Sequence, residues 1–177
     1  MKPEEQTNLY GYKDDFKKFS TMYNNGILPN KILLSGNEGI GKCTLAYHLI
    51  NYIFNNKKDE SYNLDKNIIN TNSKSFKLIK NNSHPNFYKI GLSREKNSID
   101  ILQIREMIKF SQKTSFDNNE KIILIDQIEH LNQNSANALL KILEDLNDKI
   151  IFILIYSRGK KIIKTIKSRC IEFKLFL

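Results

Sequence analysis

The chain has 177 residues, which suits one α/β core and is too short for two well-sized domains. It has 28 Lys and Arg residues against 19 Asp and Glu residues, a formal net charge of +9. Lysine is spread along the chain without a compact basic block, so the charge fits either solubility or a nucleic-acid partner. Two distant cysteines and no apolar run of membrane length exclude a disulfide-stapled or membrane-spanning protein, and they predict a reduced, soluble, cytoplasmic one.

The first elements form a helix, a strand, a glycine-rich loop and a second helix. Residues 14–24 carry Phe16, Phe19 and Tyr23 at helical spacing, and a glycine follows that predicted helix. A short apolar strand at residues 32–34 runs into the loop. Beyond the loop, apolar residues recur at helical spacing to about residue 54.

The glycine-rich loop has the spacing of a phosphate-binding loop. Gly36, Gly41 and Lys42 match the pattern G-x-x-x-x-G-K, in which backbone N–H groups and a helix N-terminus face phosphate oxygens. A chance glycine turn before a helix is the alternative. Because a strand precedes the loop and a helix follows it, the pattern predicts a nucleotide site.

Cys43 occupies the position where this loop normally has Ser or Thr. A thiol is a soft ligand, whereas Mg²⁺ is a hard cation that prefers oxygen. Thr44 has a hydroxyl, but it lies about 100° further round a helix and should not face the same site. The sequence therefore predicts weakened metal binding.

The middle of the chain changes in composition. Residues 55–83 are rich in Asn, Lys and Ser, and they predict an irregular insertion. Residues 87–90 form a short predicted strand. Asp100 and Gln103 have the spacing of a capping box, which starts a predicted helix over residues 101–112.

The apolar run at residues 121–126 ends in Asp126, as expected of a buried parallel strand that leads to a ligand site. This position fits a Walker B aspartate, although a carboxylate that caps the next turn is the alternative. Gln127 follows, and an amide is not a base near neutral pH. Glu129 lies two positions further on and need not face phosphate. The metal ligand and the base are thus both altered.

The last part of the chain alternates helix and strand. Asn132 caps a predicted helix that runs to about Asp145, and residues 149–156 form the most apolar strand. Ser157 at its tip either senses a γ-phosphate or marks a simple strand boundary. A short turn or helix at residues 164–170 leads to a final strand at 171–175.

Arg169 is one of four arginines in a lysine-rich chain. A guanidinium presents a planar fork that matches phosphate oxygens, which an ammonium cannot do. Taken alone, Arg169 fits either a surface ion pair or a phosphate contact.

Several of these segments resemble the AAA+ domain of bacterial clamp-loader subunits. They are residues 36–46, 124–132, 136–145 (ANALLKILED) and 165–170 (TIKSRC), and their order agrees over nearly the whole chain. Within the family the chain is similar to the delta-prime class. That class typically lacks both the Mg²⁺-binding hydroxyl and the Walker B glutamate, unlike the ATP-hydrolysing gamma/tau class.

The resemblance implies a three-layer α/β P-loop NTPase fold with a five-stranded parallel sheet in the order 5-1-4-3-2. It implies that Ser168 presents Arg169 as an arginine finger to ATP on a neighbouring gamma/tau subunit. The partners implied are gamma/tau, delta, the sliding clamp and primed DNA, without a membrane. The resemblance also implies a nucleotide site on this chain itself, a degenerate loop that holds ATP or ADP weakly. Asp126 would be the remnant of its Mg²⁺ site. The residues of this implied site are Gly36, Gly39, Gly41, Lys42, Cys43, Thr44, Asp126 and Ser157.

Two departures from the family pattern qualify this picture. Many relatives carry a four-cysteine zinc module before the segment that begins at His84, but residues 55–83 contain no cysteine, so no zinc is expected. Family members continue into a helical lid and a collar domain, whereas this sequence ends just after the fifth strand. Residues 1–177 are therefore expected to form the AAA+ domain alone.

Three functions remain open from the sequence. The first is a non-hydrolysing subunit that donates Arg169 to a neighbour. The second is a slow gamma/tau-type ATPase in which Thr44 and Glu129 replace the missing groups. The third is a nucleic-acid-binding module that relies on the positive charge, although it lacks interleaved aromatic residues.

Overall fold

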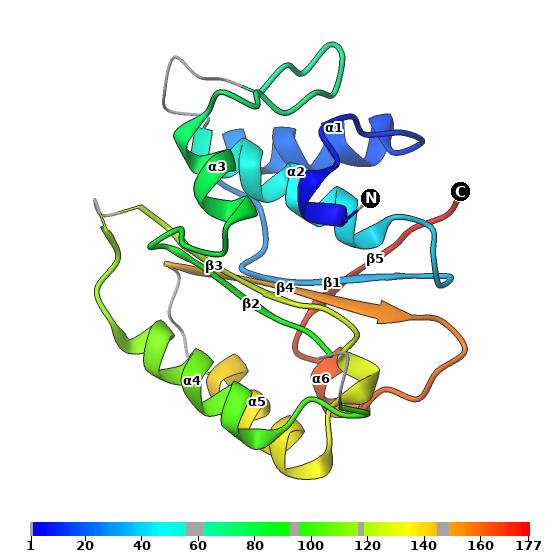
Figure 1. Cartoon of the computed structure of the whole chain (residues 1–177). Helices are drawn as coiled ribbons and strands as arrows, with labels where there is room; N and C mark the ends of the chain where they lie inside the picture. Colours follow the sequence, from blue (N-terminus) through cyan, green and yellow to red (C-terminus); the bar gives the residue numbers. More distant parts are fainter. Residues whose placement is uncertain (1, 56–61, 93–95, 117–118, 145–148) are drawn as a thin grey trace. The chain divides into compact units, whose positions relative to one another are not determined.

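Figure 1 shows the computed structural model, which describes residues 2–55, 62–92, 96–116, 119–144 and 149–177. The residues pack into two compact units within the one predicted domain. Unit 1 comprises Met1–Leu28, Gly39–His84 and Leu177, and unit 2 comprises Pro29–Glu38 and Pro85–Phe176. The glycine-rich loop passes from unit 2 into unit 1 between Glu38 and Gly39.

Unit 2 contains a five-stranded parallel sheet in the order β2-β3-β4-β1-β5 (Figure 1). Read from the other edge, this is the predicted order 5-1-4-3-2, so the prediction is confirmed. All five predicted strands are present, each within two residues of its expected bounds. They are β1 (Lys31–Gly36), β2 (Phe87–Ile90), β3 (Lys121–Ile125), β4 (Ile150–Ser157) and β5 (Ile171–Lys174).

The central strands are continuous apolar runs, as is usual in parallel sheets. Every residue of β3 is buried, including Lys121 at its start. The Lys121 ammonium donates to the carbonyl oxygen of Phe110 at 2.7 Å, and it also bonds the Lys113 carbonyl. Burial, followed by the nearby charge of Lys113, lowers the pKa of Lys121. This lysine therefore caps the end of the preceding helix.

Two helices cover one face of the sheet within unit 2 (Figure 1). Helix α4 (Ile101–Gln112) begins with the predicted capping box, since the Asp100 side chain accepts from the Gln103 N–H and the Gln103 side chain accepts in return. Helix α5 (Gln133–Glu144) begins after Asn132, whose side-chain oxygen accepts from the Ser135 N–H at 2.9 Å. Asp145, its predicted end, lies outside the described residues. The two helices and the strands share one buried core, which includes Ile104, Met107, Leu139, Leu143, Ile123 and Leu154.

Two short elements complete unit 2. A 3-10 turn, η3 (Ile128–His130), follows β3, and a one-turn helix, α6 (Lys164–Lys167), precedes β5. The second of these matches the predicted turn or helix at residues 164–170.

Unit 1 is helical. Its elements are η1 (Pro3–Glu5), α1 (Lys13–Asn24), α2 (Lys42–Asn55) and α3 (Lys74–Lys80). The helices predicted at residues 14–24 and after the glycine loop are thereby confirmed.

Helix α3 corrects the prediction of an irregular insertion at residues 55–83. The Ser73 hydroxyl caps this helix by accepting from the Phe76 N–H at 3.3 Å, and it donates to the Asn55 side chain at 2.7 Å. Phe76 and Ile79 are buried. So short a helix depends on tertiary packing, which the polar composition of the segment conceals. Residues 56–61 of the insertion lie outside the described residues.

An aromatic cluster around His48 forms the core of unit 1. The His48 side chain is fully buried, and its ring makes edge-to-face contacts with the rings of Phe16 and Tyr62. Its Nε2 lies 3.1 Å from the carbonyl oxygen of Gln6, and its Nδ1 lies 2.7 Å from the Tyr62 hydroxyl. Because a carbonyl only accepts, Nε2 donates to Gln6 and Nδ1 accepts from Tyr62. Burial lowers the pKa of His48 to about 4.

In the described ranges no helix is both long and apolar enough to cross a bilayer.

His48 should make the protein less stable in acid. Its pKa is about 4 when folded and about 6.5 when unfolded, so the unfolded state binds the extra proton first as the pH falls. The stabilisation is complete above pH 6.5 and is lost as the pH falls toward 4. We expect His48 to account for a loss of about 3 kcal/mol in the free energy of unfolding between pH 7 and pH 4, measured by urea titration.

The variant His48→Gln should be less stable at pH 7 but should lack this part of the pH dependence. His130→Gln, which replaces a half-buried histidine of η3, serves as the matched control and should retain it. An unchanged pH dependence in His48→Gln would show that the histidine is not held neutral.

Candidate nucleotide site

The carboxyl ends of three adjacent strands lie at one edge of the sheet in unit 2. In the register of β1 with β4, Gly36 lies opposite Ser157, and the Arg158 N–H donates to the Gly36 carbonyl at 2.9 Å. Strand β3 pairs with β4 on its other side and leads directly to Asp126. The sheet thus brings three predicted site residues, Gly36, Asp126 and Ser157, to one edge. Ligands of open parallel sheets bind at this edge.

Gln127 adopts the left-handed conformation, with φ 57° and ψ 51°. A non-glycine residue rarely adopts this conformation, and it turns the chain sharply from β3 into η3. Gln127, which follows Asp126, therefore lies in a sharp turn, and its side chain is an amide that is not a base near neutral pH.

Glu129 is a buried carboxylate at the same edge, and the sequence did not predict this placement. Its side chain is 2% exposed, one oxygen accepts from the Ser157 N–H at 3.4 Å, and the other lies 3.9 Å from the Lys160 ammonium. Lys160 also pairs with Glu38 of the glycine loop at 3.1 Å. Lys160 thus links the loop to the tip of β4 through two carboxylates. Lys160 belongs to no motif, and Glu38 occupies an unspecified position of the glycine loop, so the sequence marked neither residue.

The second half of the glycine-rich loop, from Gly39 on, belongs to unit 1. Gly39 and Gly41 have φ values of 80° and 88°, a conformation that a side chain disfavours. The Tyr12 hydroxyl donates to the Ile40 carbonyl at 2.6 Å, and a Cβ at Gly41 would lie 3.6 Å from the Tyr12 ring. Burial, with a smaller effect of Asp15, raises the pKa of Tyr12 to about 12. Tyr12 therefore holds the loop as a neutral hydrogen-bond donor.

The three residues after the loop glycines begin helix α2. Lys42 is 6% exposed at the helix start, whereas Cys43 and Thr44 are half-buried. Thr44 lines a pocket in which Cys43 takes no part.

This pocket lies wholly within unit 1 and has a volume of about 330 Å³. That volume is at the lower end of the range for small-molecule sites, which is about 300 to 1,000 Å³. The pocket joins the N-terminal segment to the loop, and it is lined by Lys2, Pro3, Gln6, Asn8, Leu9, Tyr10, Tyr12, Gly39, Ile40, Gly41, Thr44 and Leu177.

Arg169 lies at the surface of unit 2, directly after α6. Its side chain is 34% exposed, and one guanidinium nitrogen pairs with the Glu144 carboxylate at 2.5 Å. A second nitrogen donates to the Thr165 carbonyl at 3.0 Å. The Ser168 hydroxyl donates to the same carbonyl at 3.1 Å. The surface ion pair that the sequence left open as an alternative is therefore present, and it leaves the guanidinium accessible.

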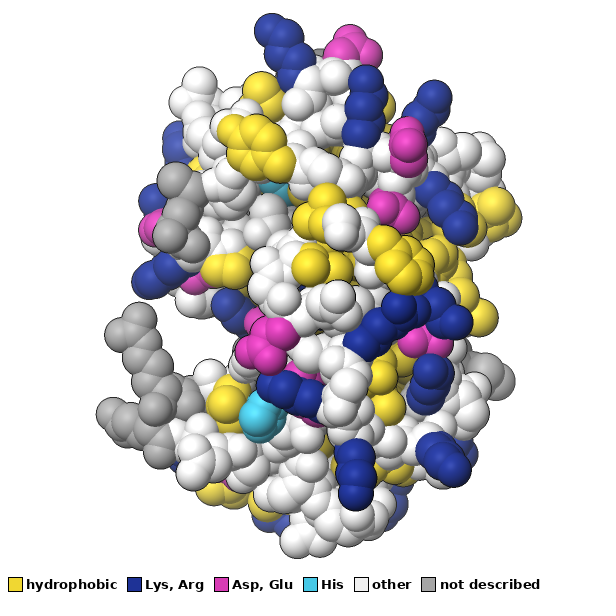
Figure 2. Space-filling view, turned by 90° about the vertical axis from the view of Figure 1, so that its right-hand side faces the viewer, with side chains coloured by type: hydrophobic (Ala, Val, Ile, Leu, Met, Phe, Trp, Pro, Cys, Tyr) yellow, Lys and Arg dark blue, Asp and Glu magenta, His cyan; other side chains and the backbone are white. Residues whose placement is uncertain are grey.

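Basic side chains are distributed over much of the face in Figure 2, among acidic and uncharged ones. This distribution agrees with the spread of lysine along the sequence.

A profile of the family described as DNA polymerase III, delta subunit, matches residues 11–176. The chain therefore belongs to the DNA polymerase III delta subunit family.

Two curated relatives illustrate this membership. The chain is 29% identical to the DNA polymerase III subunit delta' of Pseudomonas aeruginosa over 140 residues, which is 79% of this chain and 41% of the relative. It is 32% identical to the DNA polymerase III subunit gamma of Buchnera aphidicola subsp. Schizaphis graminum over 178 residues, 98% of this chain and 46% of the relative. The chain thus spans less than half the length of these relatives.

Solved structures show the same fold at low identity. A gamma subunit-related protein of Thermotoga maritima aligns with a TM-score of 0.58 at 19% identity, covering 93% of this chain and 46% of that one. The RuvB branch migration motor of the same organism aligns with a TM-score of 0.53 at 16% identity, covering 98% of this chain and 49% of that one. These structures share the predicted α/β fold.

The two cysteines of this family member should differ in reactivity. Burial raises the pKa of Cys170 to about 11, so about one molecule in a thousand carries its thiolate at pH 8. Cys43 is half-buried. We expect a thiol reagent such as iodoacetamide to label Cys43 in the native protein and Cys170 only on unfolding, as measured by peptide mass spectrometry.

The variant Cys43→Ser should remove the native labelling, and Cys170→Ala should leave it unchanged. Rapid labelling of Cys170 in the native protein would contradict the burial of this thiol.

Proposed function

We propose that this chain is the ATPase-like part of a DNA polymerase III clamp-loader subunit of the delta-prime type, which does not hydrolyse ATP itself. In this proposal Arg169 acts as an arginine finger on ATP held by a neighbouring gamma/tau subunit. The observation that carries the proposal is the placement of Arg169, whose side chain is one-third exposed and pairs with an exposed carboxylate. Exposed ion pairs are weak, so phosphate oxygens can replace Glu144.

The chain's own site retains the parts that bind phosphate and lacks parts that break the bond. Lys42 and the loop N–H groups at the start of α2 suit phosphate oxygens. At the position of the Mg²⁺ ligand, Cys43 has a thiol in place of a hydroxyl. At the position of the base that would activate water, Gln127 has an amide in place of a carboxylate. ATP or ADP would therefore bind weakly through Lys42 and the loop, with Asp126 as the remaining carboxylate for a metal. Zinc has no proposed role.

The proposed partners follow from the family. Gamma/tau would hold the ATP that Arg169 contacts, and delta would complete the assembly. The complex would act on a sliding clamp and primed DNA, and this chain would reach both through the complex.

A slow ATPase of the gamma/tau type is the second candidate. The 32% identity to a gamma subunit favours it, as does the buried carboxylate of Glu129 beside Ser157. In that case Glu129 would replace the missing base and Thr44 the missing hydroxyl. However, Thr44 lines the pocket with the N-terminal segment. One Glu129 oxygen accepts from the Ser157 N–H at 3.4 Å, and the other lies 3.9 Å from the Lys160 ammonium without a hydrogen bond among the described residues.

Replacing the proposed finger should slow the assembled complex. In a complex reconstituted with gamma/tau and delta, Arg169→Ala should lower clamp-stimulated ATP hydrolysis about a thousandfold at the site it serves, by comparison with fingers supplied in trans to GTPases. The measurement is steady-state phosphate release, with assembly verified by size-exclusion chromatography.

Two variants serve as controls. Lys167→Ala removes a neighbouring cation that pairs with Glu172, and it should leave the rate unchanged. Glu144→Gln removes the resting partner of Arg169 and should leave the rate unchanged or raise it. A fully assembled Arg169→Ala complex with the wild-type rate would refute the finger role.

Restoring both missing groups should create an ATPase. We expect Cys43→Ser and Gln127→Glu to be inactive singly and active together, because a metal ligand and a base are both required. The measurement is single-turnover hydrolysis by the isolated protein, with Lys42→Ala added to the double variant as the control. Hydrolysis by the wild-type protein that Lys42→Ala abolishes would favour the second candidate instead.

A further inference from the structure

A pocket in unit 1 lies between α1 and the turn at residues 64–67, and none of its lining residues belongs to the candidate nucleotide site. Its volume is about 480 Å³, within the range for small-molecule sites of about 300 to 1,000 Å³. One wall is a stripe of α1 that runs from Lys13 to Asn24. The other wall is the turn, which Asn63 and Ile68 close by exchanging backbone hydrogen bonds at 3.0 and 3.1 Å. Two separate segments of one compact unit therefore build the pocket.

Asn67 supplies a buried amide to the wall of this pocket. The residue is 7% exposed and adopts the left-handed conformation, with φ 52°, which Asn tolerates in turns. Its backbone carbonyl accepts from the Leu9 N–H at 3.1 Å. In the described ranges no protein group hydrogen-bonds its side chain. Because a polar group this deeply buried normally has a hydrogen-bond partner, the amide indicates a ligand in the pocket.

Charges of both signs line the pocket, and they do not pair with one another. Lys13 and Lys17 lie one helical turn apart on α1, whereas Asp65 lies in the turn. All three are exposed, and none has an ionic partner in the part of the chain that the structure describes. Two neighbouring ammonium groups attract a dianion, and a lone carboxylate accepts from hydroxyl groups. The pocket thus has an anion site on the helix and an acceptor on the turn.

We propose that this pocket binds an adenine nucleoside monophosphate. Lys13 and Lys17 hold its phosphate, as ammonium groups do in phosphate sites. Asp65 accepts from the ribose hydroxyls, a role that carboxylates have in other nucleotide sites. The Asn67 amide bonds the adenine edge, where a donor and an acceptor lie side by side. The buried Phe16 ring belongs to the apolar part of the lining.

The combination of groups favours a mononucleotide over simpler or longer ligands. Inorganic phosphate would contact the lysines but would leave the Asn67 amide without a partner. A nucleoside would satisfy the amide but would leave both ammonium groups without a counter-charge. A nucleic-acid strand gains from a row of cations, whereas Asp65 would repel its next phosphate. This inference does not depend on the role of Arg169 or on the glycine loop.

The test is isothermal titration calorimetry of the protein with AMP, adenosine and inorganic phosphate. AMP should bind with a dissociation constant below about 1 mM, and at least about tenfold more tightly than adenosine or phosphate, because only AMP contacts both walls. The variant Lys42→Ala, which disables the glycine loop, should leave the affinity for AMP unchanged. Loss of AMP binding in Lys42→Ala would place AMP in the glycine loop, which would overturn this inference and support the proposed nucleotide site.

Variants of the two walls separate their contributions. The pair Lys13→Gln and Lys17→Gln should weaken AMP at least about fourfold and leave adenosine unchanged, since each exposed ion pair is worth a factor of about two to five. Asn67→Asp keeps a residue that tolerates the left-handed conformation but removes the N–H donors, so it should weaken both AMP and adenosine at least about tenfold. Asn82→Asp is its matched control, because Asn82 also has φ 52° but is exposed outside the pocket.

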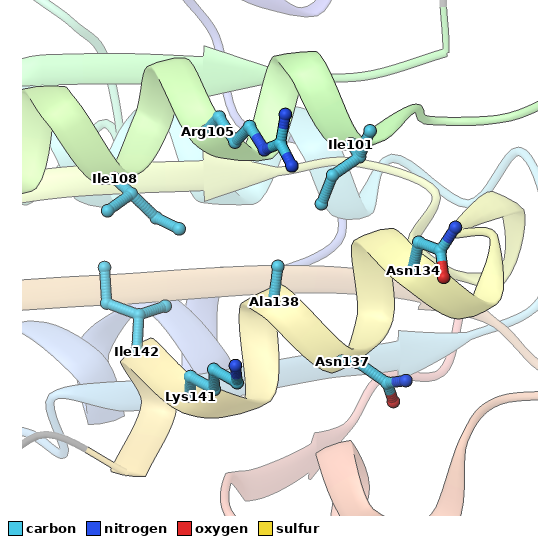
Figure 3. Close-up of a pocket in the computed structure, with 8 residues that line it drawn as sticks. All are labelled: Ile101, Arg105, Ile108, Asn134, Asn137, Ala138, Lys141 and Ile142. Carbon is cyan, nitrogen blue, oxygen red and sulfur yellow. The ribbon is translucent and has the colours of Figure 1, made fainter.

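The groove between α4 and α5 in unit 2 provides the matched control for the two lysines. Figure 3 shows Arg105 on α4 and Lys141 on α5, with Ile108 and Ile142 pointing toward each other between these helices. Both cations are exposed, and Arg105→Gln with Lys141→Gln makes the same change in net charge as the lysine pair. Because neither residue lines the pocket in unit 1, this variant should leave AMP binding unchanged.

Three further outcomes would overturn the proposal. The first is no binding of AMP up to about 1 mM, the weak end of specific affinity. The second is binding of AMP that neither Asn67→Asp nor the lysine pair changes. The third is phosphate that binds as tightly as AMP, which would make the pocket a site for a simple anion.

Discussion

The parallel pairing of β1 with β4 is the constraint on which the candidate site depends. Because the two strands run in the same direction and in a fixed register, the end of β1 at Gly36 lies level with Ser157. Strand β3 pairs on the far side of β4 and delivers Asp126 to the same edge. A shift in this register would separate the glycine loop from the residues that face it. The buried apolar strands therefore organise the polar chemistry without taking part in it.

Ion pairs within unit 2 link the side chains at that edge. Lys160 lies between Glu38 of the loop and the buried Glu129, which also accepts from the Ser157 N–H. Two carboxylates share this one ammonium. In the proposed function, this edge would have a thiol at position 43 and an amide at position 127 in place of a hydroxyl and a carboxylate.

Arg169 is held differently. Its partner Glu144 is exposed, and the guanidinium keeps an open face. An exposed ion pair orients a side chain. Exchanging its partner for another anion costs little free energy, because such a pair contributes little. A buried carboxylate partner would hold the arginine in place, because a buried carboxylate left without its cation is costly in free energy. The geometry thus suits a cation that changes partners, and in the proposed complex it would exchange Glu144 for phosphate.

Local patterns in the sequence were sufficient for the strands, the capping box at Asp100 and the glycine loop, because each depends on residues that are close in the chain. The thiol at position 43 and the amide at position 127 were also visible there, since both lie in short motifs. The tertiary structure alone placed Glu144 against Arg169, 25 residues away, and Lys160 between Glu38 and Glu129. It also revealed α3 and the groove between α4 and α5. Those features depend on contacts between segments that are distant in sequence, and periodicity and composition carry no information about such contacts.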